Sequence, residues 1–225
     1  MKQDGKQIAI IGGGGALGMG LALRWAQAGH RIVIGSRDPA RGVEAAQQIN
    51  NTISEGTAIG CGNDDAAIAG DIVVLTVPFA HHAETLGAIG PHLAGKILVD
   101  VTVPLVPPKV RTAQLPPGGS CAKTAQDTLG PGTRVVSAFQ NVAAAHLADP
   151  NHDIECDVLV CGNDPAARAE VIELAEDAGM RAFHAGRIDN SVVAETLTSA
   201  LIFINHHYKI DGAGIRITGT PAGSD

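Results

Sequence analysis

The feature that most constrains the fold is a glycine-rich turn placed directly after a short apolar segment. Residues 8–11 (Ile-Ala-Ile-Ile) are continuously apolar, as expected of a strand that is buried on both faces. Glycines follow at the spacing Gly-x-Gly-x-x-Gly, as Gly13, Gly15 and Gly18, and a helical pattern covers residues 16–28. In this context the spacing predicts a dinucleotide site. The first glycine permits the turn, the second lets backbone N–H groups reach a pyrophosphate, and the third lets the helix pack closely on the strand.

The rest of the chain repeats the alternation of apolar strands and helices. Further strands are predicted at residues 31–35, 57–61, 71–77, 96–101, 134–138, 157–160 and 181–184, and further helices at 39–50, 120–129, 165–178 and 190–208. Repeated β-α-β units predict an α/β fold with a doubly wound, mostly parallel Rossmann-type sheet. We expect a nucleotide-binding domain over residues 1–188 and a small C-terminal segment, a helix and a tail, over residues 189–225.

Composition and charge argue against several classes of function. The 225 residues include only six aromatic side chains, which leaves few for stacking on single-stranded nucleic acid. The net charge of −7 disfavours a general nucleic-acid or anionic membrane surface. No apolar run approaches the roughly 18–20 residues of a membrane helix, and residues 1–6 lack the apolar core of a signal peptide. We therefore expect a cytoplasmic protein with no nucleic-acid and no membrane partner.

The cysteine and histidine residues form no recognisable metal-binding or nucleophilic pattern. Four cysteines in a chain of this length do not make a disulfide scaffold, so we expect reduced thiols. His152, Cys156 and Cys161 come nearest to a metal cluster, but their spacing fits no common zinc pattern. The sequence also lacks the Gly-x-Ser-x-Gly turn of acyl-transfer enzymes. We expect no metal site.

The end of the second predicted strand indicates which dinucleotide is bound. NAD-binding folds usually carry an Asp or Glu here that bonds the ribose 2′-hydroxyl, whereas this chain has Ser36 and Arg37, with Arg41 one helical turn later. A hydroxyl and two guanidinium groups suit a 2′-phosphate, which a carboxylate would repel. Asp38 lies one or two residues too late for the acidic role and is expected to cap the next helix. The sequence therefore predicts NADP(H) rather than NAD(H).

Residues that follow the fourth and fifth strands are expected to line the same crevice, because the carboxyl ends of parallel strands share one edge of the sheet. After the fourth strand these are Thr76, Val77 and Pro78, and after the fifth they are Val101 and Val103. We expect them to pack along the ribose and nicotinamide. An ordinary strand-ending proline would explain Pro78 equally well.

Two polar residues, Gln140 and Asn141, follow the sixth predicted strand. At this edge their side chains would be in reach of a substrate or of the nicotinamide amide, so we expect them to orient one of these groups. For Asn141 the alternative is that it caps a helix beginning at Val142.

Together these motifs resemble the coenzyme F420-dependent NADP oxidoreductases over nearly the whole chain. The segments that carry the resemblance are Ile-Ile-Gly-Gly-Gly-Gly-Ala-Leu-Gly at 10–18, Gly-Ser-Arg at 35–37, Leu-Thr-Val-Pro-Phe at 75–79, Val-Val-Ser-Ala-Phe-Gln-Asn-Val-Ala-Ala at 135–144, Val-Cys-Gly-Asn-Asp at 160–164 and Tyr-Lys-Ile-Asp-Gly-Ala-Gly-Ile-Arg-Ile-Thr-Gly at 208–219. The first segment alone is generic. The glycine-bearing tail after the last helix, combined with Ser-Ala-Phe-x-Asn-Val, is much more specific.

The resemblance implies reversible hydride transfer between NADP(H) and the 8-hydroxy-5-deazaflavin coenzyme F420 as substrate. It implies that Ser36, Arg37 and Arg41 hold the 2′-phosphate. It also implies that residues 189–225 complete the deazaflavin site and form a homodimer or higher homo-oligomer. The other implied contacts are Gly13, Gly14, Gly15, Ala16, Leu17 and Gly18 around the pyrophosphate, Ala144 beside the nicotinamide, and Ala213, Gly214 and Ile215 at the deazaflavin.

At one place the chain departs from this family pattern. Archaeal members carry His where this chain has Gln140, followed by Thr rather than Asn141. Gln cannot carry a proton near neutral pH, but hydride transfer between two stacked rings mainly requires orientation. Two alternatives stay open: a related NADPH reductase that acts on FMN or FAD, ferric iron or an imine, and a non-catalytic NADP-binding protein.

Overall fold

The computed structural model of the protein describes residues 5–53, 58–149 and 151–219. The strands in this part of the chain are β1 (Gln7–Ile11), β2 (Arg31–Ser36), β3 (Ala58–Gly62), β4 (Ile72–Leu75), β5 (Ile97–Asp100), β6 (Arg134–Ser137), β7 (Val158–Gly162) and β8 (Ala182–His184). The α-helices are α1 (Ala16–Gln27), α2 (Pro39–Thr52), α3 (Asn63–Ala69), α4 (Phe79–Ile89), α5 (Cys121–Leu129), α6 (Ala144–Ala148), α7 (Pro165–Asp177) and α8 (Ser191–Tyr208). Every predicted strand is present, although Thr57, the predicted start of the third, lies outside the described residues.

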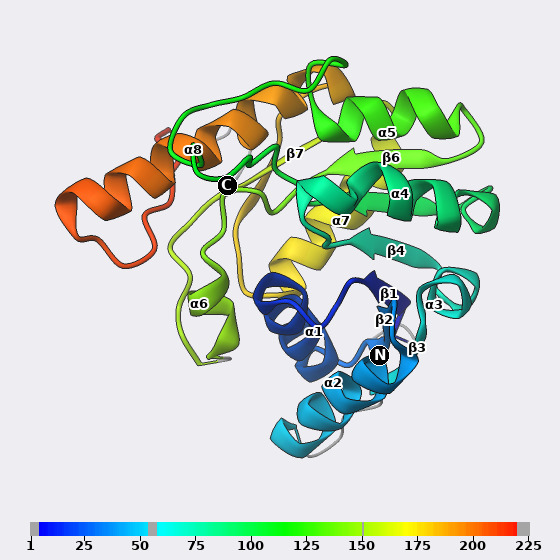
Figure 1. The fold of residues 1–225 in the computed structure, drawn as a ribbon. Helices are drawn as coiled ribbons and strands as arrows, with labels where there is room; N and C mark the ends of the chain where they lie inside the picture. The colour runs from blue at the N-terminus through cyan, green and yellow to red at the C-terminus, as the bar shows by residue number, and fades with distance from the viewer. Residues whose placement is uncertain (1–4, 54–57, 150, 220–225) are drawn as a thin grey trace.

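The strands form one sheet in the order β3-β2-β1-β4-β5-β6-β7-β8 (Figure 1). Strands β1 to β6 are parallel to one another. β7 runs antiparallel to β6, with Ser137 opposite Cys161, and β8 runs parallel to β7. The predicted doubly wound, mostly parallel sheet is therefore confirmed. Because the chain winds outward in both directions from β1 and β4, a crevice is expected at their carboxyl ends.

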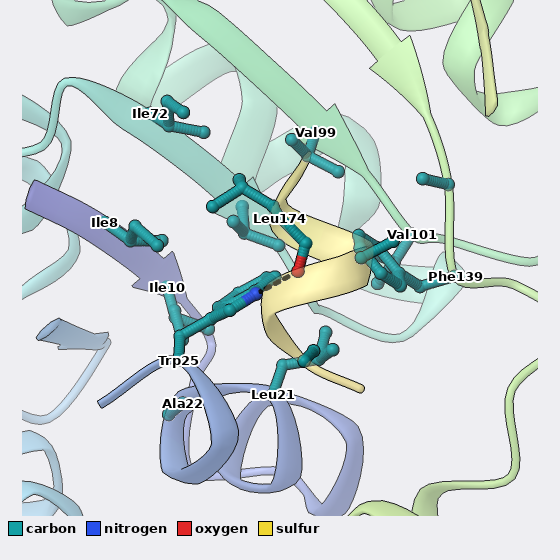
Figure 2. Close-up of a cluster of buried hydrophobic side chains, with 14 of the residues drawn as sticks. Ile8, Ile10, Leu21, Ala22, Trp25, Ile72, Val99, Val101, Phe139 and Leu174 are labelled. Carbon is teal, nitrogen blue, oxygen red and sulfur yellow. Dashed lines mark hydrogen bonds between the residues drawn. The ribbon is translucent and has the colours of Figure 1, made fainter. Parts of the chain in front are cut away.

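The two faces of the sheet carry separate cores, as the alternation of side chains along a strand requires. Ile8 and Ile10 of β1 belong to one cluster, whereas Ala9 and Ile11 belong to the other. Helices α1, α2 and α7 cover the first face, and α3, α4 and α5 cover the second. Figure 2 shows Trp25 at the centre of the first cluster, where its indole Nε1 donates to the carbonyl of Leu174 at 2.7 Å.

Phe139 connects this core to the turn after β6. Its φ of 71° is unfavourable for a bulky residue, and the side chain is fully buried. The ring packs edge-to-face on Trp25, with 5.8 Å between the centroids. The buried ring thereby holds the turn in a conformation that the backbone alone would not choose.

Sequence pattern does not predict α3 or α4. Both helices begin at residues without a side-chain cap, Gly62 and Pro78, so the usual start signal is missing. They form because their inward positions, including Ala66 in α3 and Leu86 and Ile89 in α4, fill the second core.

Helix α8 has an unusual distribution of side chains. Its buried residues are Ser191, Ala194, Glu195, Ser199 and Leu201, most of which are small or polar. Large apolar side chains on it, including Val193 and Phe203, are exposed in the single chain. Figure 1 shows the C-terminal half of α8 extending beyond the sheet before the tail turns back. No helix in the described residues has both the length and the apolar character needed to cross a membrane.

Candidate cofactor-binding site

A cleft of about 1060 Å³ lies at the carboxyl ends of the parallel strands. It is lined from the turn after β1, the ends of β2, β4 and β5, and the first turns of α1, α2 and α4. Its volume and its place at the reversal of strand order are those expected of a dinucleotide site. Twelve of the predicted residues line it: Gly14, Gly15, Ala16, Leu17, Ser36, Arg37, Arg41, Thr76, Val77, Pro78, Val101 and Val103.

The turn after β1 needs glycine at three positions. Gly12 has a φ of +72°, and a Cβ there would lie 2.6 Å from Cγ1 of Val77. A Cβ on Gly13 would lie 2.8 Å from the carbonyl oxygen of Ile10, so this position also has room only for glycine. A Cβ on Gly18 would lie 2.8 Å from the hydroxyl of Thr76. The predicted role of Gly18 in close packing of the helix on the sheet is therefore confirmed.

The N-terminus of α1 is open toward the cleft. Gly15 caps it without a side-chain hydrogen bond, and its first turn carries no acidic residue. By contrast, α2, α5 and α7 are capped by Asp38, Ser120 and Asp164. A Cβ on Gly14 would meet no atom within 4 Å. Free backbone N–H groups, a helix dipole and open space together suit a pyrophosphate.

The end of β2 supplies polar and basic groups to the same cleft. Arg37 and Arg41 are exposed, and Ser36 Oγ accepts a hydrogen bond from the Asp38 amide at 3.3 Å, which leaves the hydroxyl proton for another acceptor. Asp38 Oδ1 accepts from the amide of Ala40 at 3.1 Å, so the prediction that Asp38 caps α2 is confirmed. A hydroxyl donor and two guanidinium groups fit a phosphate monoester.

The cleft also contains polar residues that sequence reasoning missed. They are Glu44, Gln48, Asn63, His81, Thr85 and Thr102. Asn63 follows β3 and His81 lies in the first turn of α4, after the two helix starts that lack a cap signal. Asn63, His81 and Thr102 share a signal of position, because each follows a strand or lies in a first helical turn at the sheet edge. The other three lie within helices, Glu44 and Gln48 in α2 and Thr85 in α4.

Gln140 and Asn141 do not line this cleft, and both are buried. Gln140 Nε2 donates to the carbonyl of Asp100 at 2.8 Å and to the hydroxyl of Ser137 at 2.9 Å. Asn141 Nδ2 donates to the carbonyl of Asp157 at 2.8 Å. Asn141 does not cap a helix at Val142, because α6 begins at Ala144 and has no side-chain cap. Both side chains hold strand ends together.

The tail and the residues around the start of α6 line a second hollow of about 500 Å³, whose lining includes Ala143, His146, Gly212 and Gly214. Asp157 anchors the tail: its amide donates to the carbonyl of Ile215 at 2.8 Å, and its carboxylate accepts from the amide of Ile217. Asn205 Oδ1 accepts from the amide of Ala213 at 2.7 Å. Ala144, Ala213, Gly214 and Ile215 therefore do not line the main cleft, and of these four Gly214 alone lines the second hollow.

Three elements, α4, β5 and α8, each contribute one buried ionisable side chain near the carboxyl end of β5. His82 Nε2 of α4 is 2.7 Å from Oδ2 of Asp100 at the end of β5. Burial lowers the pKa of His82, but the hydrogen bond and the charge of Asp100 outweigh it and leave the pKa raised. Glu195 of α8 accepts from the amides of Cys121 and Ala122 at 2.7 and 3.1 Å, and burial raises its pKa to about 7. Sequence reasoning missed this group because its members are far apart in the chain.

The cysteines carry no disulfide, since all four are free. Cys161 is buried and Cys156 is half-buried, and burial raises the pKa of both thiols. Within residues 5–53, 58–149 and 151–219, no group of three or more His, Cys, Asp or Glu side chains is arranged to hold a metal ion.

Comparison with known proteins agrees with this geometry. Residues 7–104 match the sequence model of a family described as NADP oxidoreductase, coenzyme F420-dependent. The F420-dependent NADP reductase of Methanocaldococcus jannaschii is 42% identical over 94% of this chain and 98% of its own length. The enzyme of the same name from Methanothermobacter thermautotrophicus is 37% identical over 96% of both chains. A crystal structure from Arthrobacter sp. FB24, provisionally named an F420-dependent NADP reductase, superposes with a TM-score of 0.80 at 29% identity, covering 96% of this chain and 100% of that one.

Proposed function

Because this chain belongs to the family of coenzyme F420-dependent NADP oxidoreductases, we propose that it transfers a hydride reversibly between NADP(H) and the deazaflavin coenzyme F420. The observation that carries the proposal is the 1060 Å³ cleft, which combines an open helix N-terminus with Ser36, Arg37 and Arg41. When bound, the two coenzymes supply the redox chemistry, a hydride moving between C4 of the nicotinamide and C5 of the deazaflavin. An NADP(H)-linked reaction draws on the cytoplasmic pool of this nucleotide, so the cytoplasm is the expected compartment.

The chain's own residues bind and orient the dinucleotide. The turn from Gly13 to Gly18 receives the pyrophosphate on backbone N–H groups, and Ser36, Arg37 and Arg41 receive the 2′-phosphate. The residues after β4 and β5 flank the ribose and nicotinamide: Thr76, Val77, Pro78, Val101 and Val103. Thr76 has its own hydroxyl bonded to the carbonyl of Ile11 at 2.9 Å, so it acts through its shape and backbone.

The C-terminal segment 189–225 completes the second half of the proposed site. Gly214 of the tail lines the second hollow together with His146 of α6, whose first residue is Ala144. We assign Ala213, Gly214 and Ile215 to the wall of the deazaflavin site. Gln140 is a positioning residue here, because both protons of its amide are already committed to Asp100 and Ser137. Thr198 of α8 donates to the Gln140 carbonyl at 2.8 Å, which ties the segment to the end of β6.

The decisive experiment mixes the purified protein with NADPH and oxidised coenzyme F420. We expect the visible absorption of the deazaflavin to bleach as one NADPH is consumed per coenzyme, and the reverse reaction to restore it. Parallel reactions offer FMN, FAD, ferric iron or a cyclic imine in place of F420. Turnover with one of these and none with F420 would favour the related reductase, and no turnover with any acceptor would favour a non-catalytic NADP-binding protein.

A pair of glycine substitutions separates this activity from that of a contaminating reductase. Gly14 and Gly87 both have open space around the position that a Cβ would take, so each should accept an Asp without unfolding. Only Gly14→Asp brings a carboxylate to the proposed pyrophosphate site, where it should reduce activity by about a hundredfold through charge repulsion. Gly87→Asp, on the exposed side of α4, should leave the activity unchanged.

The exposed apolar side of α8 supports a further part of the proposal, a homo-oligomer formed with a second copy of this helix. Val193, Phe203 and Tyr208 are large, at least half exposed, and carried on one helix. Phe203→Glu should shift the protein toward monomer in analytical ultracentrifugation, because it places a charge in the apolar contact. Ile68→Glu, at an equally exposed residue of α3, is the matched control. A monomeric wild type, or equal shifts in both variants, would contradict this interface.

A further inference from the structure

Asn63 lies at the cofactor edge of the sheet beside the residues assigned to the 2′-phosphate. In the parallel pairing of β2 with β3, Ser36 is opposite Gly62. Arg37 comes directly after Ser36, and Asn63 comes directly after Gly62. Arg37 and Asn63 therefore occupy equivalent positions at the ends of β2 and β3. Ser36, Arg37 and Asn63 all line the same cleft.

The side-chain oxygen of Asn63 lies against β2, next to Gly35. This Oδ1 atom is buried with no hydrogen-bond donor among the described residues. This oxygen lies 3.1 Å from the position that a Cβ on Gly35 would take, so glycine at that position lets the oxygen tuck against β2. The residue as a whole is only half-buried, and its Nδ2 is neither enclosed nor bonded to an acceptor in the described chain. The exposed end of the side chain is thus a donor of two protons.

The surroundings favour an anionic acceptor for these protons. The described lining residues of the cleft include two guanidinium groups, Arg37 and Arg41, and one carboxylate, Glu44. Asp38 is committed to the amide of Ala40 and lies 3.9 Å from the Nε of Arg41. A phosphate monoester presents only acceptor oxygens, which matches a cluster of a hydroxyl donor, a guanidinium and an amide NH₂. A buried oxygen without a hydrogen-bond donor destabilises the fold. Proteins often keep such an oxygen where the nitrogen of the same amide has a function.

We propose that Asn63 is a specificity-determining residue whose side-chain amide donates to the 2′-phosphate of NADP(H), together with Ser36 and Arg37. This inference rests on the proposed NADP(H) function and adds a contact from the residue that follows β3. It explains why an amide, rather than a carboxylate of the same shape, suits this position: an Asp would repel the 2′-phosphate at short range.

The test measures binding of two fragments that differ only in the 2′-phosphate, adenosine 2′,5′-bisphosphate and adenosine 5′-monophosphate, by isothermal titration calorimetry. Asn63→Asp should weaken binding of the bisphosphate by about tenfold or more, and binding of the monophosphate by about twofold or less. Asn63→Ala should weaken the bisphosphate by about fivefold. In the enzyme assay, Asn63→Asp should lower kcat/KM for NADPH by the same factor and leave that for NADH unchanged.

Two further variants serve as controls for these binding measurements. Gln48→Glu makes the same amide-to-carboxylate change elsewhere in the cleft and should affect the two fragments alike. Arg37→Ala should selectively weaken the bisphosphate, as Asn63→Asp does. Thermal unfolding of each variant verifies that it folds.

The outcomes separate the inference from the proposed function. If wild type binds both fragments equally, the NADP(H) assignment itself is overturned, and this inference with it. If wild type and Arg37→Ala behave as expected but Asn63→Asp weakens both fragments equally, or neither, only the role of Asn63 is overturned.

Discussion

Replacing Arg24 by Met is expected to lower the free energy of unfolding by about 3–5 kcal/mol, the scale for breaking a buried charged network. Arg24 lies near the end of α1 and is almost fully buried. Its guanidinium donates to five backbone carbonyls, those of His146, Leu147, Asp149, His152 and Ala178. Met fills the space but donates to none of these carbonyls, and of the five Asp149 keeps a backbone donor, the amide of His152. Urea unfolding followed by circular dichroism measures the difference.

The geometry also predicts how other side chains behave at this position. Lys keeps the charge but has three donors on one nitrogen, so Arg24→Lys should recover only part of the lost stability. Arg31→Met is the matched control, because Arg31 is exposed at the start of β2 and its loss should change stability by no more than about 0.5 kcal/mol. Equal losses for Arg24→Met and Arg31→Met would show that the carbonyl network does not stabilise the fold.

The second large effect concerns pH. Burial raises the pKa of Glu195 to about 7 from its usual 4.5, so the folded state holds a proton there that the unfolded state has already released. The stability contributed by this proton is full below about pH 4.5 and is lost as the pH rises through 7. Relative to Glu195→Gln, which cannot titrate, wild-type stability should therefore fall by about 3 kcal/mol between pH 4.5 and 8. Urea titrations at several pH values measure this difference.

The ionisable groups facing Glu195 are Asp100, His82, Cys121 and Cys161, and all four remain in the variant. The hydrogen bond and the charge of Asp100, which do most to raise the pKa of His82, are present in both proteins, and the variant loses only the smaller contribution of the Glu195 charge to that pKa. Glu84→Gln, which removes a carboxylate from the exposed side of α4, is the control. If Glu84→Gln changes the pH dependence as much as Glu195→Gln does, the buried proton is not the cause.

Much of the dinucleotide half of the site could be predicted from sequence because its signals are local. The turn around Gly18, the basic residues after β2 and the cap at Asp38 each depend on residues within a few positions of one another. The doubly wound, mostly parallel sheet also followed, because repeated β-α-β units permit few topologies.

The remaining features depend on contacts between distant segments, which no local pattern encodes. Gln140 and Asn141 look like site residues because they follow a strand, but their protons go to Asp100 and Asp157. In the sequence Arg24 looks like an ordinary helical arginine. Its carbonyl partners are apparent only in the fold, where α6 and the loop after α6 lie against its guanidinium. Asn63 stands at the start of a helix with no cap signal, so its place beside Arg37 emerges only from the pairing of β2 with β3.

The reversed direction of β7 determines where the C-terminal tail is attached to the sheet. Because β7 runs against β6, the residue before it, Asp157, is delivered to the rim where the other strands end. The tail fastens there through Ile215 and Ile217, and Arg181 braces the same carboxylate at 2.7 Å. Residues 215–217 are thus held at the edge of the sheet where β1 to β6 end. A single antiparallel strand therefore brings a segment from beyond the last helix to the same edge of the sheet as the turn after β1.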